Sequence, residues 1–118
     1  MTNKNFKIIV PFYNVEQWIN KCVRSIQLQT YQDFKCFLID DISTDSSVSI
    51  IEKLIANDDR FTLIKNTEKK YALRNIFEAI EQSGNNSEDI IVTLDGDDWL
   101  ATKTVLSTLD NIYRESDC

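Results

Sequence analysis

The amino-acid sequence predicts an α/β fold in which one mostly parallel β-sheet carries helices on both faces, in a single domain over residues 1–118. Short apolar runs alternate four times with segments whose apolar residues recur at helical spacing. Three of the four runs are almost continuously apolar, which is typical of parallel strands that are covered on both faces. Polar clusters follow three of the runs, and ligands of such sheets bind beyond the carboxyl ends of the strands.

The first half of the chain contains two strand–helix units. The apolar run at 7–11 predicts a strand, with Pro11 at its end because proline cannot donate to a central ladder. Apolar residues at helical spacing over 15–26 predict a helix that ends near residue 29. The apolar run at 34–39 predicts the second strand, and a stripe over 48–55 predicts the second helix.

The second half repeats the pattern. A third strand is expected at 61–64, and an apolar stripe over 73–80 predicts the third helix. Residues 83–87 have the composition of a loop. A fourth apolar run at 90–94 predicts the last strand, and apolar residues from 105 onward predict a helix up to the C-terminus.

Composition excludes several classes of function. Thirteen Lys and Arg against nineteen Asp and Glu give a net charge of −6, which argues against nucleic-acid binding because phosphate neutralisation needs clustered cations. Cys22, Cys36 and Cys118 form neither a zinc pattern nor an even disulfide set, so we expect reduced thiols and a cytoplasmic location. No run approaches the roughly 20 apolar residues of a membrane span, so any membrane association is expected through parts outside this sequence.

Three carboxylates follow the fourth predicted strand, at Asp95, Asp97 and Asp98. Carboxylates this close repel one another, and a divalent cation would hold them ionised together. Their hard oxygen ligands suit Mg²⁺, Mn²⁺ or Ca²⁺. Gly96 is expected to allow a sharp turn and the close approach of a ligand. The alternative is a surface turn whose acids cap the next helix.

Acids also follow the second predicted strand. One of Asp40 and Asp41 is interpreted as an exposed strand-end acid and the other as a hydrogen-bond partner of a base or ribose. Asp45 is expected to cap the following helix.

Three aromatic side chains, Tyr13, Trp18 and Trp99, are candidates for packing or for ligand contact. Tyr13 has two interpretations, stacking on a flat ring or packing at a strand end. Trp18 is expected in the core on the first helix, and Trp99 is expected either in the core or in a pocket lining.

The basic residues gather in one place, at Lys65, Lys69, Lys70 and Arg74. Lys70 and Arg74 are four residues apart, so they are expected to share a helix face where they could clamp a diphosphate. For Lys65 and Lys69 a solvated helix face is the preferred interpretation.

Five separated segments carry a family resemblance: Ile8-Ile-Val-Pro-Phe-Tyr-Asn-Val-Glu16, Ser25-Ile-Gln-Leu-Gln-Thr-Tyr-Gln-Asp-Phe34, Leu38-Ile-Asp-Asp-Ile-Ser-Thr-Asp-Ser46, Ala72-Leu-Arg-Asn75 and Leu94-Asp-Gly-Asp-Asp-Trp-Leu100. In this order they resemble the opening strand, the first helix end, the aspartate loop, the Ala-Arg-Asn segment and the DxD motif of family 2 glycosyltransferases. The resemblance implies the nucleotide-binding half of a GT-A fold, a Rossmann-like three-layer αβα arrangement.

The same resemblance implies a nucleotide-diphosphate sugar donor, usually a UDP-sugar, and Mn²⁺ or Mg²⁺. The implied metal ligands are Asp95, Asp97 and Asp98, with Asp97 alternatively on the ribose. The implied contacts to the nucleotide come from eight residues: Pro11, Phe12, Tyr13, Asn14, Asp41, Lys70, Arg74 and Asp97. Among them the 11–14 turn and Asp41 would contact the base, and Lys70 or Arg74 would approach the diphosphate or base.

The chain departs from the family pattern at Ile42 and at 69–71, where glycines are usual. No catalytic general base is identified in it, and the family places both the base and the acceptor site beyond Cys118. We therefore expect a chain truncated at its C-terminal end, which supplies the donor-binding half of an inverting transferase. The acceptor, whether a glycan, a lipid-linked group or a protein, is left open.

Two other functions stay open. One is a non-catalytic nucleotide-binding or interaction module with the same fold, and the other is a receiver-type α/β signalling domain that binds Mg²⁺ around a phosphorylated Asp. A truncated sheet also exposes an apolar face or strand edge, which predicts self-association into a homo-oligomer.

Overall fold

The computed structural model describes residues 5–82 and 89–116, so the loop expected at 83–87 and the thiol of Cys118 lie outside the described part. Strands and helices alternate as the sequence predicts, with bounds that differ by up to a few residues. The elements are β1 (Phe6–Phe12), α1 (Ile19–Gln27), β2 (Phe34–Asp40), α2 (Ser47–Leu54), β3 (Phe61–Lys65), α3 (Tyr71–Gln82), β4 (Ile90–Thr93) and α4 (Val105–Ser116).

The four strands form one parallel sheet in the order β3-β2-β1-β4. β1 is therefore a central strand, although it contains Pro11. The ladder between β1 and β4 ends at the pair Ile9–Thr93, so the missing N–H of Pro11 leaves that ladder intact. On the other side Pro11 stands opposite Ile39 of β2, one residue before β1 ends. The prediction of proline near the strand end is confirmed.

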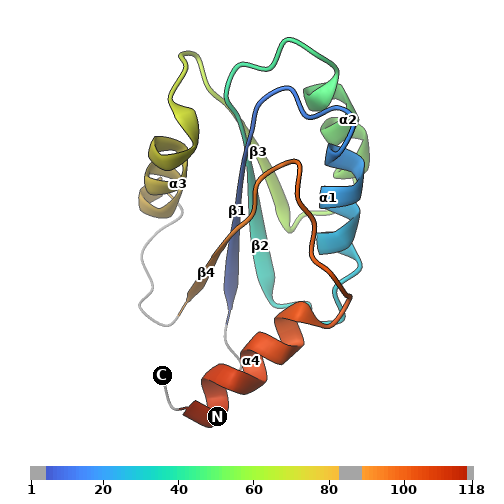
Figure 1. Cartoon of the computed structure of the whole chain (residues 1–118), viewed down its shortest axis with the longest axis vertical. Helices are drawn as coiled ribbons and strands as arrows, with labels where there is room; N and C mark the ends of the chain where they lie inside the picture. The colour runs from blue at the N-terminus through green and yellow to red at the C-terminus, as the bar shows by residue number, and fades with distance from the viewer. Residues whose placement is uncertain (1–4, 83–88, 117–118) are drawn as a thin grey trace.

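Helices cover both faces of the sheet, which confirms the predicted three layers. In Figure 1, α1 and α2 lie on one side of the sheet and α3 on the other, while α4 lies across one end. The main core forms between the sheet and α1, and Leu106 of α4 reaches it. A smaller core joins Ile9 and Ile39 to Ala79 of α3. Each fully buried aliphatic side chain stabilises the fold by about 1.5–3 kcal/mol.

Of Trp18, Asp45 and Trp99, only Trp18 differs from the place that the sequence predicts. Trp18 is 44% exposed, because it is the residue before α1, where helical spacing no longer fixes a side chain's direction. Asp45 does cap α2, since its Oδ1 accepts a hydrogen bond from the Ser47 backbone N–H at 2.9 Å. Trp99 is 42% exposed and is thus outside the core.

The acids after β2 are both buried, so neither is the exposed strand-end acid of the sequence interpretation. Asp40 Oδ1 accepts a hydrogen bond from the Ser43 N–H at 2.8 Å, which shapes the loop after β2. Ile42 has a φ of 67°, in the left-handed region that favours glycine. Ile42 therefore adopts the backbone conformation that glycine usually adopts at this position. Among the described residues no helix has the length and apolar content that crossing a membrane would require.

Candidate functional site

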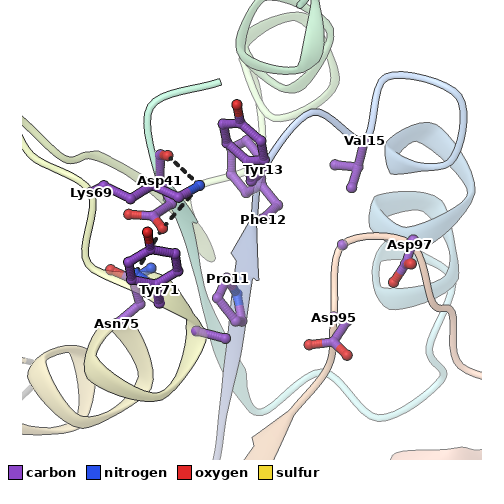
Figure 2. A pocket seen from close by; sticks show the side chains of 12 residues that line it. Pro11, Phe12, Tyr13, Val15, Asp41, Lys69, Tyr71, Asn75, Asp95 and Asp97 are labelled. Carbon is purple, nitrogen blue, oxygen red and sulfur yellow. Dashed lines mark hydrogen bonds and ion pairs between the residues drawn. The ribbon is translucent and has the colours of Figure 1, made fainter. Parts of the chain in front are cut away.

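A cleft of about 300 Å³ opens at the carboxyl end of the sheet, where the parallel strands bring their following loops together. Its lining residues come from the end of β1, from the loops after β1, β2 and β4, and from the start of α3 and the segment before it: Pro11, Phe12, Tyr13, Val15, Asp41, Lys69, Tyr71, Ala72, Asn75, Asp95, Gly96 and Asp97. Figure 2 shows Asp41, Lys69 and Tyr71 on one side of the end of β1, and Asp95 and Asp97 on the other.

Asp41 organises the first of these groups. Its carboxylate accepts hydrogen bonds from the backbone N–H groups of Lys70 and Tyr71, each at 2.8 Å, and from Asn66 Nδ2 at 3.1 Å. Burial alone would raise the pKa of Asp41, but these three hydrogen bonds stabilise the carboxylate and lower its pKa to about 2. Asp41 is thus an ionised anchor that holds the segment before α3 against β2.

Lys69 supplies the cation of the cleft. Its Nζ lies 3.2 Å from the centroid of the Tyr13 ring and 5.4 Å from that of the Tyr71 ring, which are cation–π contacts. The same Nζ forms an ion pair with Asp41 Oδ2 at 3.4 Å. The solvated helix face expected for Lys69 is therefore wrong. Lys69 precedes α3, so helical spacing could not place it.

Lys70 and Arg74 meet at Glu78, but Lys70 precedes α3, so the two do not share a helix face as their spacing predicts, and neither lines the cleft. Lys70 Nζ forms an ion pair with Glu78 Oε2 at 2.8 Å, and Arg74 Nε pairs with Glu78 Oε1 at 3.3 Å. Arg74 also reaches Glu68 at 3.4 Å. The hydrogen bond from Lys70 lowers the pKa of Glu78. Lys69 takes the position at the cleft that the sequence analysis gave to these two residues.

Tyr71 and Asn75 are among the cleft residues that the sequence did not predict. Tyr71 begins α3 with a φ of 66° and a side chain that is 70% exposed, and the Asp41 carboxylate accepts its N–H. A left-handed φ at a bulky residue is a strained arrangement that surrounding contacts have to hold. Asn75 is buried, and its Nδ2 has no hydrogen-bond partner among the described residues. Tyr71 could have been predicted as a cleft residue, because it is an aromatic residue in a segment where the family usually has glycines.

Residues 11–14, at the end of β1 and just after it, divide into two groups. Pro11, Phe12 and Tyr13 line the cleft, as the resemblance implies. Asn14 does not, and its side chain instead holds the loop before α2. Its Oδ1 accepts hydrogen bonds from the backbone N–H of Thr44 at 2.7 Å and of Asp45 at 3.3 Å. Its φ of 50° is one that asparagine tolerates.

The acidic triad, Asp95, Asp97 and Asp98, gathers as the sequence predicts. One carboxylate oxygen from each residue lies within 4.8 Å of those of the other two, and all three residues are exposed. Ligands on opposite sides of a Mg²⁺ ion are about 4 Å apart, so a small closure of the triad would fit a hard divalent cation. The oxygen-only donor set is the one such ions prefer.

The buried thiol of Cys22 lies beneath the acidic triad. The thiol of Cys22 lies 3.9 Å from the backbone oxygen of Asp95. Burial, together with the negative charges of Asp98, Asp97 and Asp95, raises the pKa of Cys22 to about 12.

Gly96 within this segment is required by packing. A Cβ at residue 96 would lie 2.6 Å from Phe12 Cβ and 3.1 Å from Val15 Cγ2, so the backbone of the acidic segment rests directly on the turn after β1. The close approach of a ligand that the sequence predicts at Gly96 is therefore wrong, because the side chains of Phe12 and Val15 fill that space. The glycine therefore fixes the distance between the triad and the floor of the cleft.

Comparison with known proteins identifies a family and several relatives of this chain. Residues 7–118 match the model of a family described as glycosyl transferase family 2. A Haemophilus influenzae protein named as an uncharacterized glycosyltransferase is 38% identical over 96 residues, which are 80% of this chain and 36% of that protein. The chain spans between 14% and 36% of the length of three such curated relatives.

Solved structures share the fold. The structure of Staphylococcus aureus TarS 1-349 in complex with UDP-GlcNAc has a TM-score of 0.80 at 24% identity, over 94% of this chain and 31% of that chain. The mannosyltransferase PcManGT from Pyrobaculum calidifontis, in complex with GDP-Man and Mn²⁺, has a TM-score of 0.77 at 23% identity, over 94% and 32% of the two chains. Both likenesses cover nearly all of the present chain.

Proposed function

Because the chain belongs to glycosyl transferase family 2, we propose that it supplies the donor-binding half of a metal-dependent enzyme that transfers a sugar, with inversion, from a nucleotide-diphosphate sugar to an acceptor hydroxyl. The observation that carries the proposal is the cleft itself. An aromatic and cationic group and two residues of the acidic triad line the same opening at the carboxyl edge of the sheet. The UDP-GlcNAc named for TarS favours a UDP-sugar as the donor.

In this proposal the base binds beside Tyr13 and Tyr71, whose exposed rings offer flat apolar faces. Asp41 is the acceptor for an N–H of the base. Its two oxygens already have four donors, about as many as a carboxylate accepts, so one of them has to leave. Lys69 is the side chain most free to do so. Its ammonium group would then move from Asp41 toward the diphosphate and pair with it.

Asp95, Asp97 and Asp98 are proposed to hold Mn²⁺ or Mg²⁺ at the other side of the cleft. When bound, such an ion neutralises diphosphate charge and assists departure of the nucleotide from the sugar. The carboxylates set the distance between the ion and the base site, because Gly96 packs their segment against Phe12 and Val15. The Mn²⁺ named for PcManGT supports this assignment.

Transfer to a hydroxyl also needs a general base that takes the proton of the attacking group. The residues described above bind and orient the donor, and none of them is assigned this role. The proton-accepting group and the acceptor site are proposed to belong to parts of the enzyme outside residues 1–118. The activity proposed for this chain is therefore donor binding.

The test is isothermal titration calorimetry of UDP into the chain, with Mn²⁺ and then with excess chelator. We expect binding that needs the metal, and a loss of about tenfold or more in affinity in Asp98→Asn, equivalent to at least ~1.4 kcal/mol. Asp59→Asn is the matched control, since Asp59 is an exposed acid outside both the acidic triad and the cleft. Equal affinity in chelator, or equal losses in both variants, would contradict the proposal.

The second candidate, a domain that binds nucleotide without taking part in transfer, shares this binding behaviour. An assay of the full-length enzyme distinguishes the two functions. It measures release of UDP from UDP-GlcNAc in the presence of acceptor. Loss of turnover in Asp98→Asn supports the transferase function, and unchanged turnover supports the binding module.

A further inference from the structure

A second groove, of about 430 Å³, lies away from the donor cleft, between α1 and the segment that follows the acidic triad. Its lining combines three cations with two exposed large apolar side chains: Lys21, Arg24, Leu28, Trp99 and Lys103. None of these residues lines the donor cleft, so the groove is a separate feature of the surface.

Hydrogen bonds behind the groove join its two walls. The Leu100 N–H donates a hydrogen bond to Ser25 Oγ at 3.0 Å, which joins the segment after the triad to α1. Gln29 is buried, and its Nε2 donates to the Thr102 carbonyl at 2.7 Å while its Oε1 accepts from the Leu106 N–H at 3.0 Å. The groove is therefore held in shape by the fold before anything binds.

The cations of the groove are available to a ligand. Six described lysines and arginines elsewhere form ion pairs with carboxylates. No described carboxylate forms an ion pair with Lys21, Arg24 or Lys103. Lys21 Nζ instead lies 3.7 Å from the centroid of the Trp99 ring. Three such cations in one groove are a local excess in a chain whose net charge is −6.

The apolar part of the groove is unusually exposed. Leu28 is 66% exposed and Trp99 is 42% exposed. Tryptophan at a membrane–water interface places its ring at the level of the headgroups, lysine and arginine pair with anionic headgroups, and a nearby leucine buries in the acyl boundary. We propose that this groove is a peripheral contact site for the surface of an anionic lipid bilayer.

The expected contact is weak and reversible. Each lysine or arginine near an anionic surface strengthens binding by about fivefold, and three of them act here. Asp97 and Asp98 lie next to Trp99 in the sequence and oppose the same surface, so the cations have to outweigh them. Screening of this attraction predicts a steep loss of binding as salt rises above about 0.1 M. The inference does not depend on the donor site.

The test is flotation of the full chain with vesicles of phosphatidylcholine alone and of phosphatidylcholine with phosphatidylglycerol. We expect the chain to float with the anionic vesicles at low salt, and to stay behind with the neutral ones. Lys21→Glu/Lys103→Glu should reduce the floated fraction many-fold, since it reverses two of the three charges. The matched control is Lys35→Glu/Lys53→Glu, two cations outside the groove with no ion pair to a described carboxylate and the same total change of charge.

A second readout follows Trp99 directly. In a Trp18→Phe background the remaining tryptophan emission should shift to shorter wavelength when anionic vesicles are added, because the ring enters a less polar environment. No flotation, equal flotation with neutral vesicles, or equal losses in the two double variants would overturn the proposal. Binding of inorganic phosphate or of an acidic protein without vesicle binding would also overturn it. Circular dichroism confirms that each variant is folded.

Discussion

Replacing Asp41 by asparagine is the sharpest test of how the segment before α3 is held. The substitution keeps the shape of the side chain and removes its charge. One oxygen becomes an NH₂ group, which then faces an N–H donor of Lys70 or Tyr71. Hydrogen bonds to a charged group contribute about 1.5–3 kcal/mol each, and a buried donor without an acceptor costs about 1–3 kcal/mol. We expect Asp41→Asn to lower the free energy of unfolding by about 3 kcal/mol at pH 7.

Part of that loss depends on pH, and its sign follows from the lowered pKa. The pKa of Asp41 falls from the ordinary 3.8 to about 2 in the folded chain, which corresponds to about 2 kcal/mol of stability. A group whose pKa is lower in the folded state contributes fully above the unfolded pKa, and loses its contribution as pH falls through the folded pKa. The stability that the charge supplies is therefore complete above about pH 5, and about half of it is gone by pH 3.

The assay is urea denaturation of wild type and Asp41→Asn, followed by circular dichroism, at pH 7 and at pH 3. The difference between the two proteins should shrink at pH 3 by about 1 kcal/mol, because only the wild type protonates Asp41. Other acids titrate in both proteins and cancel. Asp59→Asn is the control and should change stability by no more than about 0.5 kcal/mol. A destabilisation that is the same at both pH values would refute the assigned role of the Asp41 charge.

Three further predictions concern the loops around the cleft. Gly96→Ala should lower the free energy of unfolding by about 1–3 kcal/mol in urea denaturation, since its Cβ would lie 2.6 Å from Phe12 Cβ; a neutral effect would contradict that close packing. Ile42→Gly should raise the melting temperature, because glycine adopts the left-handed φ of 67° without strain. Relief of that strain gains about 1–2 kcal/mol against an entropic cost of about 0.5–1 kcal/mol, and a lower melting temperature would contradict the strain. Lys69→Met should weaken metal-dependent UDP binding by about tenfold in calorimetry through loss of a charged contact, and unchanged affinity would remove Lys69 from the donor site.

Periodicity determined most of the fold from the sequence alone. Apolar runs and helical stripes depend on neighbours within one element, so they predicted all eight elements and a parallel sheet. The acidic triad was also predictable, because its residues are adjacent in the chain and share one turn. Asp45 is another local case, since it caps the helix that begins two residues later.

Only the tertiary structure decided which side chains face the cleft. Lys69 and Lys70 are neighbours in the chain, yet Lys69 enters the cleft while Lys70 turns to Glu78. That choice depends on Asp41, which directly follows β2, far away in the sequence, and binds the backbone of this segment through a buried carboxylate. The exposure of Trp18 likewise depends on where α1 begins. Contacts between segments far apart in the sequence set these outcomes, and no local spacing encodes them.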